Sequence, residues 1–259
     1  MIKSEKPFRF QALDSAPRAT IEEERRYRKL RLAAAYRIFA LKGYDFSLAG
    51  HITVRDPEFE DQFWVAPLGP WFGHVTVSDL CRVDAGGYIL DGKGPINQAG
   101  FAIHSEIHKA RPEIHAAAHG HSINGKAWST LGRLLDPISQ DACFFYQNHA
   151  LFANFSGIVT DASEGAAIAR ALGGGRGAIL QNHGILTVGR SVDSAVAAYI
   201  FMENACEAQL KAEAAGTPVL IDHATAVLTS MQGNESDPGA YAFPPLYARI
   251  LREQPDFQD

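Results

Sequence analysis

The sequence of 259 residues has few cysteines, no long basic run and no long apolar run. Its three cysteines are scattered and show no CxxC spacing, which predicts reduced thiols in a cytoplasmic protein. A net charge of −5 gives none of the electrostatic footprint that nucleic-acid binding needs. No stretch reaches the roughly 18 apolar residues of a membrane span, and the N-terminus has no apolar signal region. We therefore expect a cytoplasmic protein that binds neither nucleic acid nor membrane.

What the sequence does have is an ordinary globular composition, 46% hydrophobic and 20% charged. A chain of this length buries enough apolar surface to fold without disulfides or a structural metal, so a bound metal would serve function. No internal repeat or interdomain linker is found. We divide the chain into an N-terminal arm (1–20), one α/β domain (21–215) and an aromatic C-terminal tail (216–259), which we expect to pack at a subunit interface.

Helical and strand patterns alternate along the domain. Thr20 and Glu23 form a T-x-x-E capping box that begins a helix, and Gly43 ends it after Leu41. Further helices are expected at 98–109, 123–128, 163–172 (capped by Ser163) and 191–215 (begun by Ser191). Strands are expected at 51–56, 62–67, 81–84, 88–92, 113–122, 141–147, 157–161, 178–184 and 185–189. This alternation predicts the α/β class.

The stretch AAAHGHS, residues 116–122, places His119 and His121 two residues apart at the end of an apolar run. Side chains at this spacing on a strand share one face, so both imidazoles can reach one metal ion. Alone, such a pair more often caps a strand. The stretch LQNHGIL adds His183 at a second strand exit. Three histidines and one open position are typical of a catalytic metal site, where a substrate or water coordinates.

Two other patterns compete with this site. His104 and His108 lie four residues apart on an expected helix, but they lack the glutamate of a HExxH motif, and hydrogen-bonded histidines are the favoured interpretation. The glycine-rich GGGRGA at 173–178 lacks the GK[ST] of a phosphate-binding loop and follows a helix. It is interpreted as the loop that ends this helix.

Three segments together resemble the class II aldolase/adducin family: AGHITVRDP (49–57), RPEIHAAAHGHS (111–122) and LQNHGILTVG (180–189). They have the order and spacing of that family, and the resemblance spans about residues 25–215. It implies an α/β/α fold around a central, mostly antiparallel sheet. It also implies a homotetramer with sites at subunit interfaces.

The resemblance further implies that His119, His121 and His183 bind a divalent metal. Zinc is the expected ion, with iron, manganese and cobalt as alternatives, because a three-histidine site suits all four. In the sugar-phosphate aldolases of this family a glutamate transfers the proton, and the matching position, nineteen residues before His119, is Gly100. A glycine transfers no proton, so this chain departs from the aldolase pattern.

The phosphate-binding positions of those aldolases are also altered. They correspond to Gly50–Thr53, Leu68–Gly69 and Gln98–Ala99, where His51, Leu68 and Ala99 replace small hydrogen-bond donors. Charge-assisted hydrogen bonds to a phosphate are strong, so their loss predicts a non-phosphorylated small-molecule substrate.

Candidate catalytic residues are His51 and Gln140, which matches the position of the tyrosine acid in the sugar-phosphate aldolases. Arg55, Asp141 and Tyr146 are candidates for substrate binding. Six nearby aromatic residues either belong to the core or line the pocket, and in the second case they predict an aromatic or apolar ligand. They are Trp71, Phe72, Phe101, Phe144, Phe145 and Tyr146.

Three functions remain open. The favoured one is a metal-dependent lyase, by retro-aldol cleavage or decarboxylation, acting on a hydroxy or keto acid that is aromatic if those rings line the pocket. The second is a non-haem iron oxygenase acting on an aromatic acid, as in an outlier branch of the family, although two histidines and a carboxylate are the commoner iron ligands. The third is a non-catalytic binding module like the head domain of adducin, against which the three histidines argue.

Overall fold

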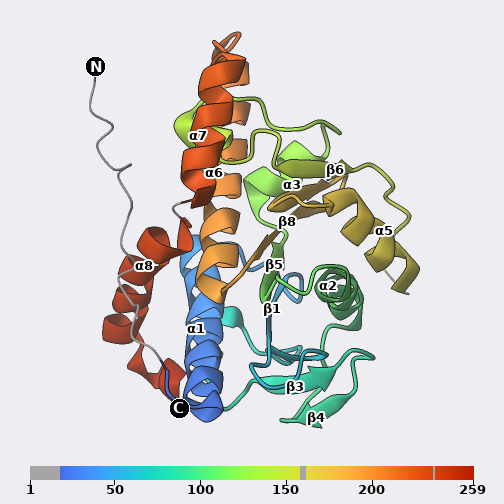
Figure 1. Cartoon of the computed structure of the whole chain (residues 1–259), viewed down its shortest axis with the longest axis vertical. Coiled ribbons are helices and arrows are strands. Elements are labelled where there is room, and N and C mark those ends of the chain that lie inside the picture. Colours follow the sequence, from blue (N-terminus) through green and yellow to red (C-terminus); the bar gives the residue numbers. More distant parts are fainter. Residues whose placement is uncertain (1–17, 158–161, 236) are drawn as a thin grey trace.

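One eight-stranded sheet lies between two layers of helices in the computed structural model, which describes residues 18–157, 162–235 and 237–259 (Figure 1). The strand order is β4-β3-β2-β1-β5-β8-β7-β6. Every neighbouring pair is antiparallel except β6 and β7, which are parallel. The predicted α/β/α architecture with a mostly antiparallel sheet is confirmed.

The strands are β1 His51–Arg55, β2 Gln62–Val65, β3 Cys81–Asp84, β4 Ile89–Asp91, β5 Ala116–Gly120, β6 His149–Phe152, β7 Gly177–Leu180 and β8 Gly184–Gly189. The helices are α1 Ile21–Lys42, α2 Gln98–Ala110, α3 Ile123–Ser129, α4 Gln140–Cys143, α5 Ala162–Leu172, α6 Val192–Ala215, α7 His223–Glu235 and α8 Gly239–Glu253. Two short 3₁₀ helices are η1 Phe72–His74 and η2 Pro255–Gln258.

The helix ends follow the capping signals in the sequence. Thr20 and Glu23 make both hydrogen bonds of the capping box, and Gly43 ends α1 in the left-handed conformation at φ 70°. Ser191 accepts a hydrogen bond from the backbone N–H of Ser194 and begins α6. These local signals fix the ends of the two helices that cover one face of the sheet.

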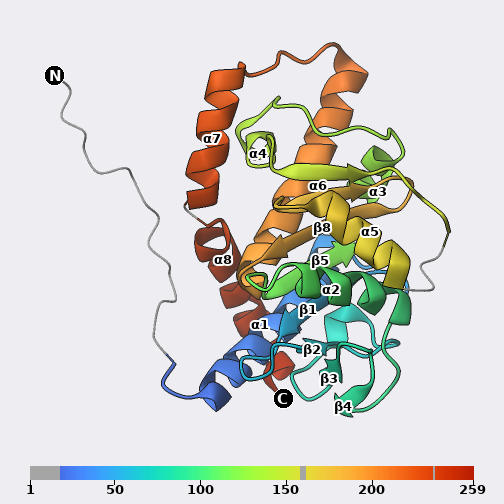
Figure 2. The same ribbon diagram turned by 45° about the vertical axis from the view of Figure 1, so that its right-hand side comes forward.

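Two apolar cores separate the helices from the sheet. Helices α1, α6 and α8 share one core with the inward side chains of β1 and β5, including Ile52 and Ala118. Helices α2 and α5 cover the opposite face, where Ile103 and Ile168 pack with Ala117. Figure 2 shows α2 and α5 together on one side of the sheet and α1 with α6 on the other. The sheet is therefore rigidly held from both sides, which suits a site at its strand ends.

Several expected elements are wrong. The segment 141–147 was expected to be a strand, but 140–143 form α4, because Ser139 caps a helical turn by accepting from the N–H of Ala142. Short apolar runs do not distinguish helix from strand. Strand β6 was not expected, and Ser163 lies inside α5 instead of capping it. The expected strand at 157–161 falls almost wholly outside the described residues.

The C-terminal tail is largely helical. It forms α7 and α8, and Phe243, Ile250 and Phe257 are fully buried in the core that contains α1. Arg37 of α1 also donates a hydrogen bond to Asp256 at 2.8 Å. The tail thus packs on its own chain, and its expected place at a subunit interface stays a prediction.

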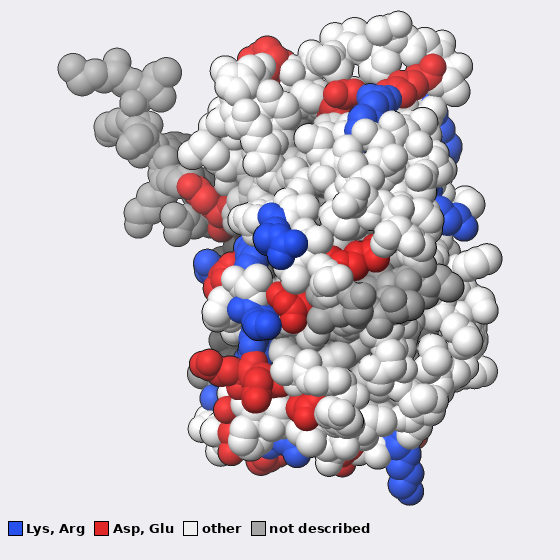
Figure 3. Space-filling model, turned by 90° about the vertical axis from the view of Figure 1, so that its right-hand side faces the viewer, with Lys and Arg blue, Asp and Glu red and all other residues white. Residues whose placement is uncertain are grey.

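Two further features are the charge of the surface and the apolarity of the helices. On the face in Figure 3 the described lysines and arginines are interspersed with acidic residues and form no continuous basic surface. Among the described helices, none combines the length and apolarity that a bilayer crossing requires.

Candidate metal centre

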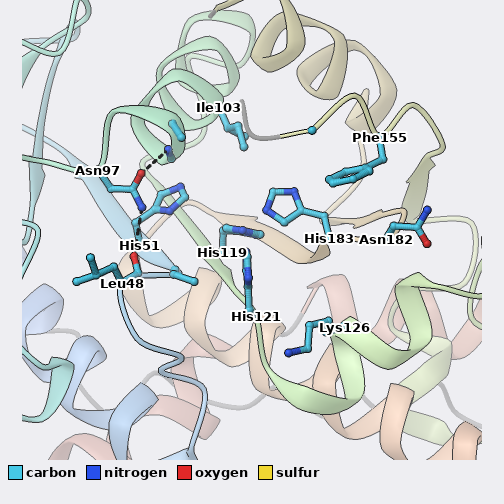
Figure 4. A pocket seen from close by; sticks show the side chains of 15 residues that line it. Leu48, His51, Asn97, Ile103, His119, His121, Lys126, Phe155, Asn182 and His183 are labelled. Carbon is cyan, nitrogen blue, oxygen red and sulfur yellow. Dashed lines mark hydrogen bonds between the residues drawn. The ribbon is translucent and has the colours of Figure 1, made fainter. Parts of the chain in front are cut away.

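The ends of two neighbouring strands bring the three predicted histidines together. Strand β5 ends at Gly120, between His119 and His121, and β8 begins directly after His183. The register pairs Gly120 with Ile185, so the two histidine segments lie side by side. One ring nitrogen from each histidine lies within 4.8 Å of the others. Figure 4 shows the three rings converging from different directions on one space.

The tautomer of His119 suits a metal ligand. Its Nδ1 lies 2.9 Å from the carbonyl oxygen of Ile185, and because a carbonyl only accepts, Nδ1 carries the proton and donates it. The neutral ring then keeps its lone pair on Nε2. Ligand histidines commonly donate the second N–H to a carbonyl in this way, which fixes the ring orientation. The donor set therefore fits a divalent ion of the zinc or iron type.

The histidines are also held in the neutral form that binds metal. Burial, followed by the neighbouring His183, lowers the pKa of His121 to about 4. The same two causes hold the pKa of His119 well below its usual range, and burial lowers the pKa of His183. Protons therefore compete little with a metal at neutral pH.

A buried carboxylate positions the turn that follows the two strand histidines. Glu203 of α6 accepts hydrogen bonds from the Ser122 hydroxyl (2.5 Å) and from the N–H groups of Asn124 (3.0 Å) and Gly125 (2.7 Å). The Ser122 hydroxyl also lies 2.8 Å from the hydroxyl of Tyr199. Free N–H groups at a helix start favour an anion. Glu203 therefore ties the first turn of α3, and with it His121, to the rigid α6.

His51 lies beside the three histidines, and Gly100 makes room for it. The register pairs His51 with His119, and their ring centroids are 5.2 Å apart. A Cβ added to Gly100 would overlap the His51 ring. His51 thus fills the space beside position 100, where the aldolase pattern places a glutamate. Neither ring nitrogen has a hydrogen-bond partner among the described residues.

Gly100→Ala tests this packing. Gly100 lies in the first turn of α2, where alanine alone would stabilise the helix by about 1 kcal/mol. We expect a net destabilisation of about 1–3 kcal/mol instead, because the methyl group overpacks against His51. Urea unfolding of both single variants and of the His51→Ala/Gly100→Ala double variant gives the coupling energy. A Gly100→Ala variant as stable as the parent chain would show that the packing of the His51 ring does not require glycine at position 100.

The helix histidines form a hydrogen-bonded network, as expected. His108 Nδ1 donates to the carbonyl of Ile114 at 3.2 Å, so Nε2 is its acceptor. The Thr53 hydroxyl therefore donates to His108 Nε2 at 3.0 Å, and its oxygen accepts from His104 Nδ1 at 2.9 Å. His104 lies against His51, with ring centroids 4.1 Å apart. The hydrogen-bonded His108, Thr53 and His104 therefore hold the His104 ring against His51.

The histidines open into a cavity of about 460 Å³, the size of a small-ligand site. Its described lining is mainly apolar and contains no carboxylate and no serine or threonine hydroxyl. It consists of Leu48, Ala49, Gly50, His51, Asn97, Ala99, Gly100, Ile103, His119, His121, Lys126, Phe155, Gly157, Asn182 and His183. Of the three positions where small hydrogen-bond donors are replaced, His51 and Ala99 line this cavity, whereas Leu68 lines a smaller neighbouring pocket that shares His51.

Four candidate residues do not line this cavity. Arg55 donates to the carbonyls of His108 (2.8 Å), in the last turn of α2, and of Ile114 (3.2 Å), after that helix. Gln140 and Asp141 are exposed in the first turn of α4, and the Tyr146 hydroxyl is hydrogen bonded to His223 at 3.0 Å. A role for these four residues in substrate binding or catalysis stays a prediction.

The cavity contains residues that sequence reasoning missed. Most of the aromatic residues considered as pocket lining are core, as with Phe145, and the ring that does line the described cavity is Phe155. It follows the unexpected strand β6, so no signal pointed to it. Lys126 was also missed, although it lies on the short helix that begins directly after the His119–His121 pair.

Comparison with known proteins agrees with this geometry. Residues 30–210 match the Class II Aldolase and Adducin N-terminal domain. The chain belongs to the class II aldolase and adducin family. A solved relative, L-fuculose 1-phosphate aldolase from Glaciozyma antarctica PI12, is 43% identical with a TM-score of 0.89, over 95% of this chain and 97% of that one.

Two curated relatives of this family member carry other names. Decarboxylase NovR from Streptomyces niveus is 41% identical over 92% of this chain and 88% of its own length. The 4-hydroxy-3-prenylphenylpyruvate oxygenase/4-hydroxy-3-prenylbenzoate synthase from Streptomyces roseochromogenus subsp. oscitans is 40% identical over 92% of this chain and 86% of its own length. Relatives at similar identity therefore bear the names of different reactions. The choice among these reactions for this chain has to be argued from the residues of its own site.

Proposed function

We propose that this protein is a metal-dependent lyase that decarboxylates a non-phosphorylated keto acid with an aromatic body. The observation that carries the proposal is a three-histidine cluster that opens into a mainly apolar cavity without a carboxylate among its described lining. The name of one relative, a decarboxylase, supports the reaction, and the name of another, a prenylbenzoate synthase, supports an aromatic acid as substrate.

The absence of a carboxylate from the described lining of the cavity favours decarboxylation over retro-aldol cleavage. A retro-aldol reaction starts with removal of a hydroxyl proton, which needs a base. Burial lowers the pKa of His51 to about 3, so His51 is a weak base at neutral pH. Decarboxylation needs no such base, because the carbon–carbon bond breaks as CO₂ leaves and its electron pair remains on the substrate.

The chain's residues then orient the substrate. When bound, a divalent metal held by His119, His121 and His183 would supply a Lewis acid for the substrate carbonyl. In a 3-oxo acid this carbonyl accepts the electron pair that CO₂ leaves behind, and a proton from solvent completes the product. Leu48, Ile103 and Phe155 provide apolar surface for the body of the acid.

A second function, an iron-dependent oxygenase, is favoured by one relative's name and by a chemical constraint. A 2-oxo acid such as an arylpyruvate has no carbonyl placed to accept the electron pair, so with a metal as the only cofactor its decarboxylation needs an oxidant. With O₂ as co-substrate, an arylpyruvate gives a 2-hydroxy arylacetate and CO₂, which balances all atoms. The relative named as a phenylpyruvate oxygenase supports this alternative.

CO₂ release distinguishes the two functions. The protein is loaded with zinc, manganese, cobalt or iron(II) and given an aryl 3-oxo acid or 4-hydroxy-3-prenylphenylpyruvate, in air and without oxygen. His183→Ala protein corrects for spontaneous decarboxylation. CO₂ release from the 3-oxo acid without oxygen supports the lyase, and CO₂ release from the arylpyruvate matched by oxygen uptake supports the oxygenase. No release above the variant with any metal would overturn both.

A further inference from the structure

Lys126 provides a positive charge at the wall of the histidine cavity. It lies on α3, is half-buried and lines the cavity. In Figure 4 its side chain lies below His121, on the same side of the cavity.

No acidic residue neutralises Lys126 in the described part of the chain. No ion pair among the described residues involves Lys126. The described lining of the cavity contains neither aspartate nor glutamate. Its ammonium instead lies 4.6 Å from the centroid of the Phe46 ring. A cation–π contact of this kind leaves the ammonium able to donate hydrogen bonds to a ligand.

The other polar side chains around the cavity have different tasks. Asn97 accepts from the N–H of Gly100 at 3.0 Å and donates to the carbonyl of Leu48 at 3.4 Å. Figure 4 shows the amide of Asn182 directed away from the histidines. Lys126 is the one lysine or arginine in the described lining.

The backbone that carries Lys126 is firmly placed. Glu203 accepts hydrogen bonds from the N–H groups of Asn124 and Gly125, in the turn that begins α3. A Cβ at Gly125 would lie 2.8 Å from Glu203 Oε2 and 2.9 Å from Ile185, so only glycine allows this close packing. The flexible lysine side chain thus starts from a fixed point beside His121.

We propose that Lys126 binds the carboxylate of the substrate and so makes this cavity specific for aromatic acids over their uncharged analogues. The aromatic body would lie along Leu48, Ile103 and Phe155, with the carboxylate on the Lys126 side. A partly desolvated ammonium–carboxylate bond is stronger than an exposed one. The inference rests on the proposed function for the ligand being an aromatic acid.

Binding of 3-phenylpropanoate and of its amide tests the proposal by calorimetry, on metal-loaded and on chelator-treated protein. Lys126→Met should weaken binding of the acid about 10- to 100-fold, the range of one charged hydrogen bond, and leave the amide unchanged. Lys126→Arg should keep most of the affinity. Lys109→Met, at an exposed lysine, is the matched control. Metal content, measured by mass spectrometry, should be unchanged in all variants.

Three results would overturn the proposal: a parent chain with no preference for the acid, a Lys126→Met variant that binds the acid as the parent does, or an equal loss for acid and amide. The proposed function is judged separately. Lysine-dependent binding of the acid without CO₂ release would contradict the reaction and leave the role of Lys126 standing. CO₂ release with an unchanged KM in Lys126→Met would support the reaction and contradict the role of Lys126.

Discussion

Replacing His183 with alanine is expected to remove the metal from the protein and to abolish CO₂ release. The cluster offers three ring nitrogens, and two histidines two residues apart on one strand end hold an ion far less firmly than three. Loss of an outer partner of a metal ligand already costs about 10–100-fold in affinity. Loss of a ligand should therefore weaken binding at least about 100-fold.

The measurement is metal content per chain by mass spectrometry, on protein purified without an affinity tag or chelator and then given back the metal. The parent chain should hold about one equivalent, and His183→Ala almost none. His183 is only partly buried, so the variant should fold, which circular dichroism and the melting temperature check. His74→Ala, at an exposed histidine outside the cavity, is the matched control. Full metal occupancy in His183→Ala would remove His183 from the site.

The histidine cluster was predictable because its signals are local. A two-residue spacing on a strand places His119 and His121 on one face, and the apolar runs before His119 and His183 mark two strands that end at the same edge. The capping residues Thr20 and Ser191 are local signals as well. Sequence reasoning succeeded where a few neighbouring residues decide the structure.

The packing around His51 was not predictable in the same way. Gly100 was recognised as a missing glutamate, but the ring that occupies its space comes from a residue 49 positions earlier. Nothing in either segment announces that contact, because it depends on how α2 crosses β1. The same holds for Phe155, which reaches the cavity from a loop after β6. Tertiary contacts between distant segments complete the site, and they require the structure.

The buried histidines of α2 predict a strong loss of stability in acid. His104 and His108 are almost fully buried, 0% and 1% exposed, and share the hydroxyl of Thr53. Burial, and then Arg55, lowers the pKa of His108 to about 3. Burial, and then His51, holds the pKa of His104 well below its usual value. In the unfolded chain both groups titrate near 6.5.

The sign of the effect follows from these pKa values. Between pH 6.5 and about 3 the unfolded chain binds protons that the folded chain does not, so stability is present above pH 6.5 and is lost as pH falls. Each histidine contributes a slope of about 1.4 kcal/mol per pH unit well below pH 6.5. At pH 5 the two together should cost about 4 kcal/mol, a large part of the roughly 5–15 kcal/mol that stabilises a typical domain.

Urea unfolding of chelator-treated protein at a series of pH values from 7.5 to 4.5 measures this slope. The cavity histidines add to it in the same direction, so the comparison between variants is what isolates α2. His108→Gln should lower the slope by about 1.4 kcal/mol per pH unit, since one titrating group is removed. His74→Gln, at an exposed histidine, should leave it unchanged. A slope in His108→Gln equal to that of the parent would show that His108 is already protonated in the folded chain. The donor and acceptor order through Thr53 would then be wrong, because it requires a neutral His108 with its lone pair on Nε2.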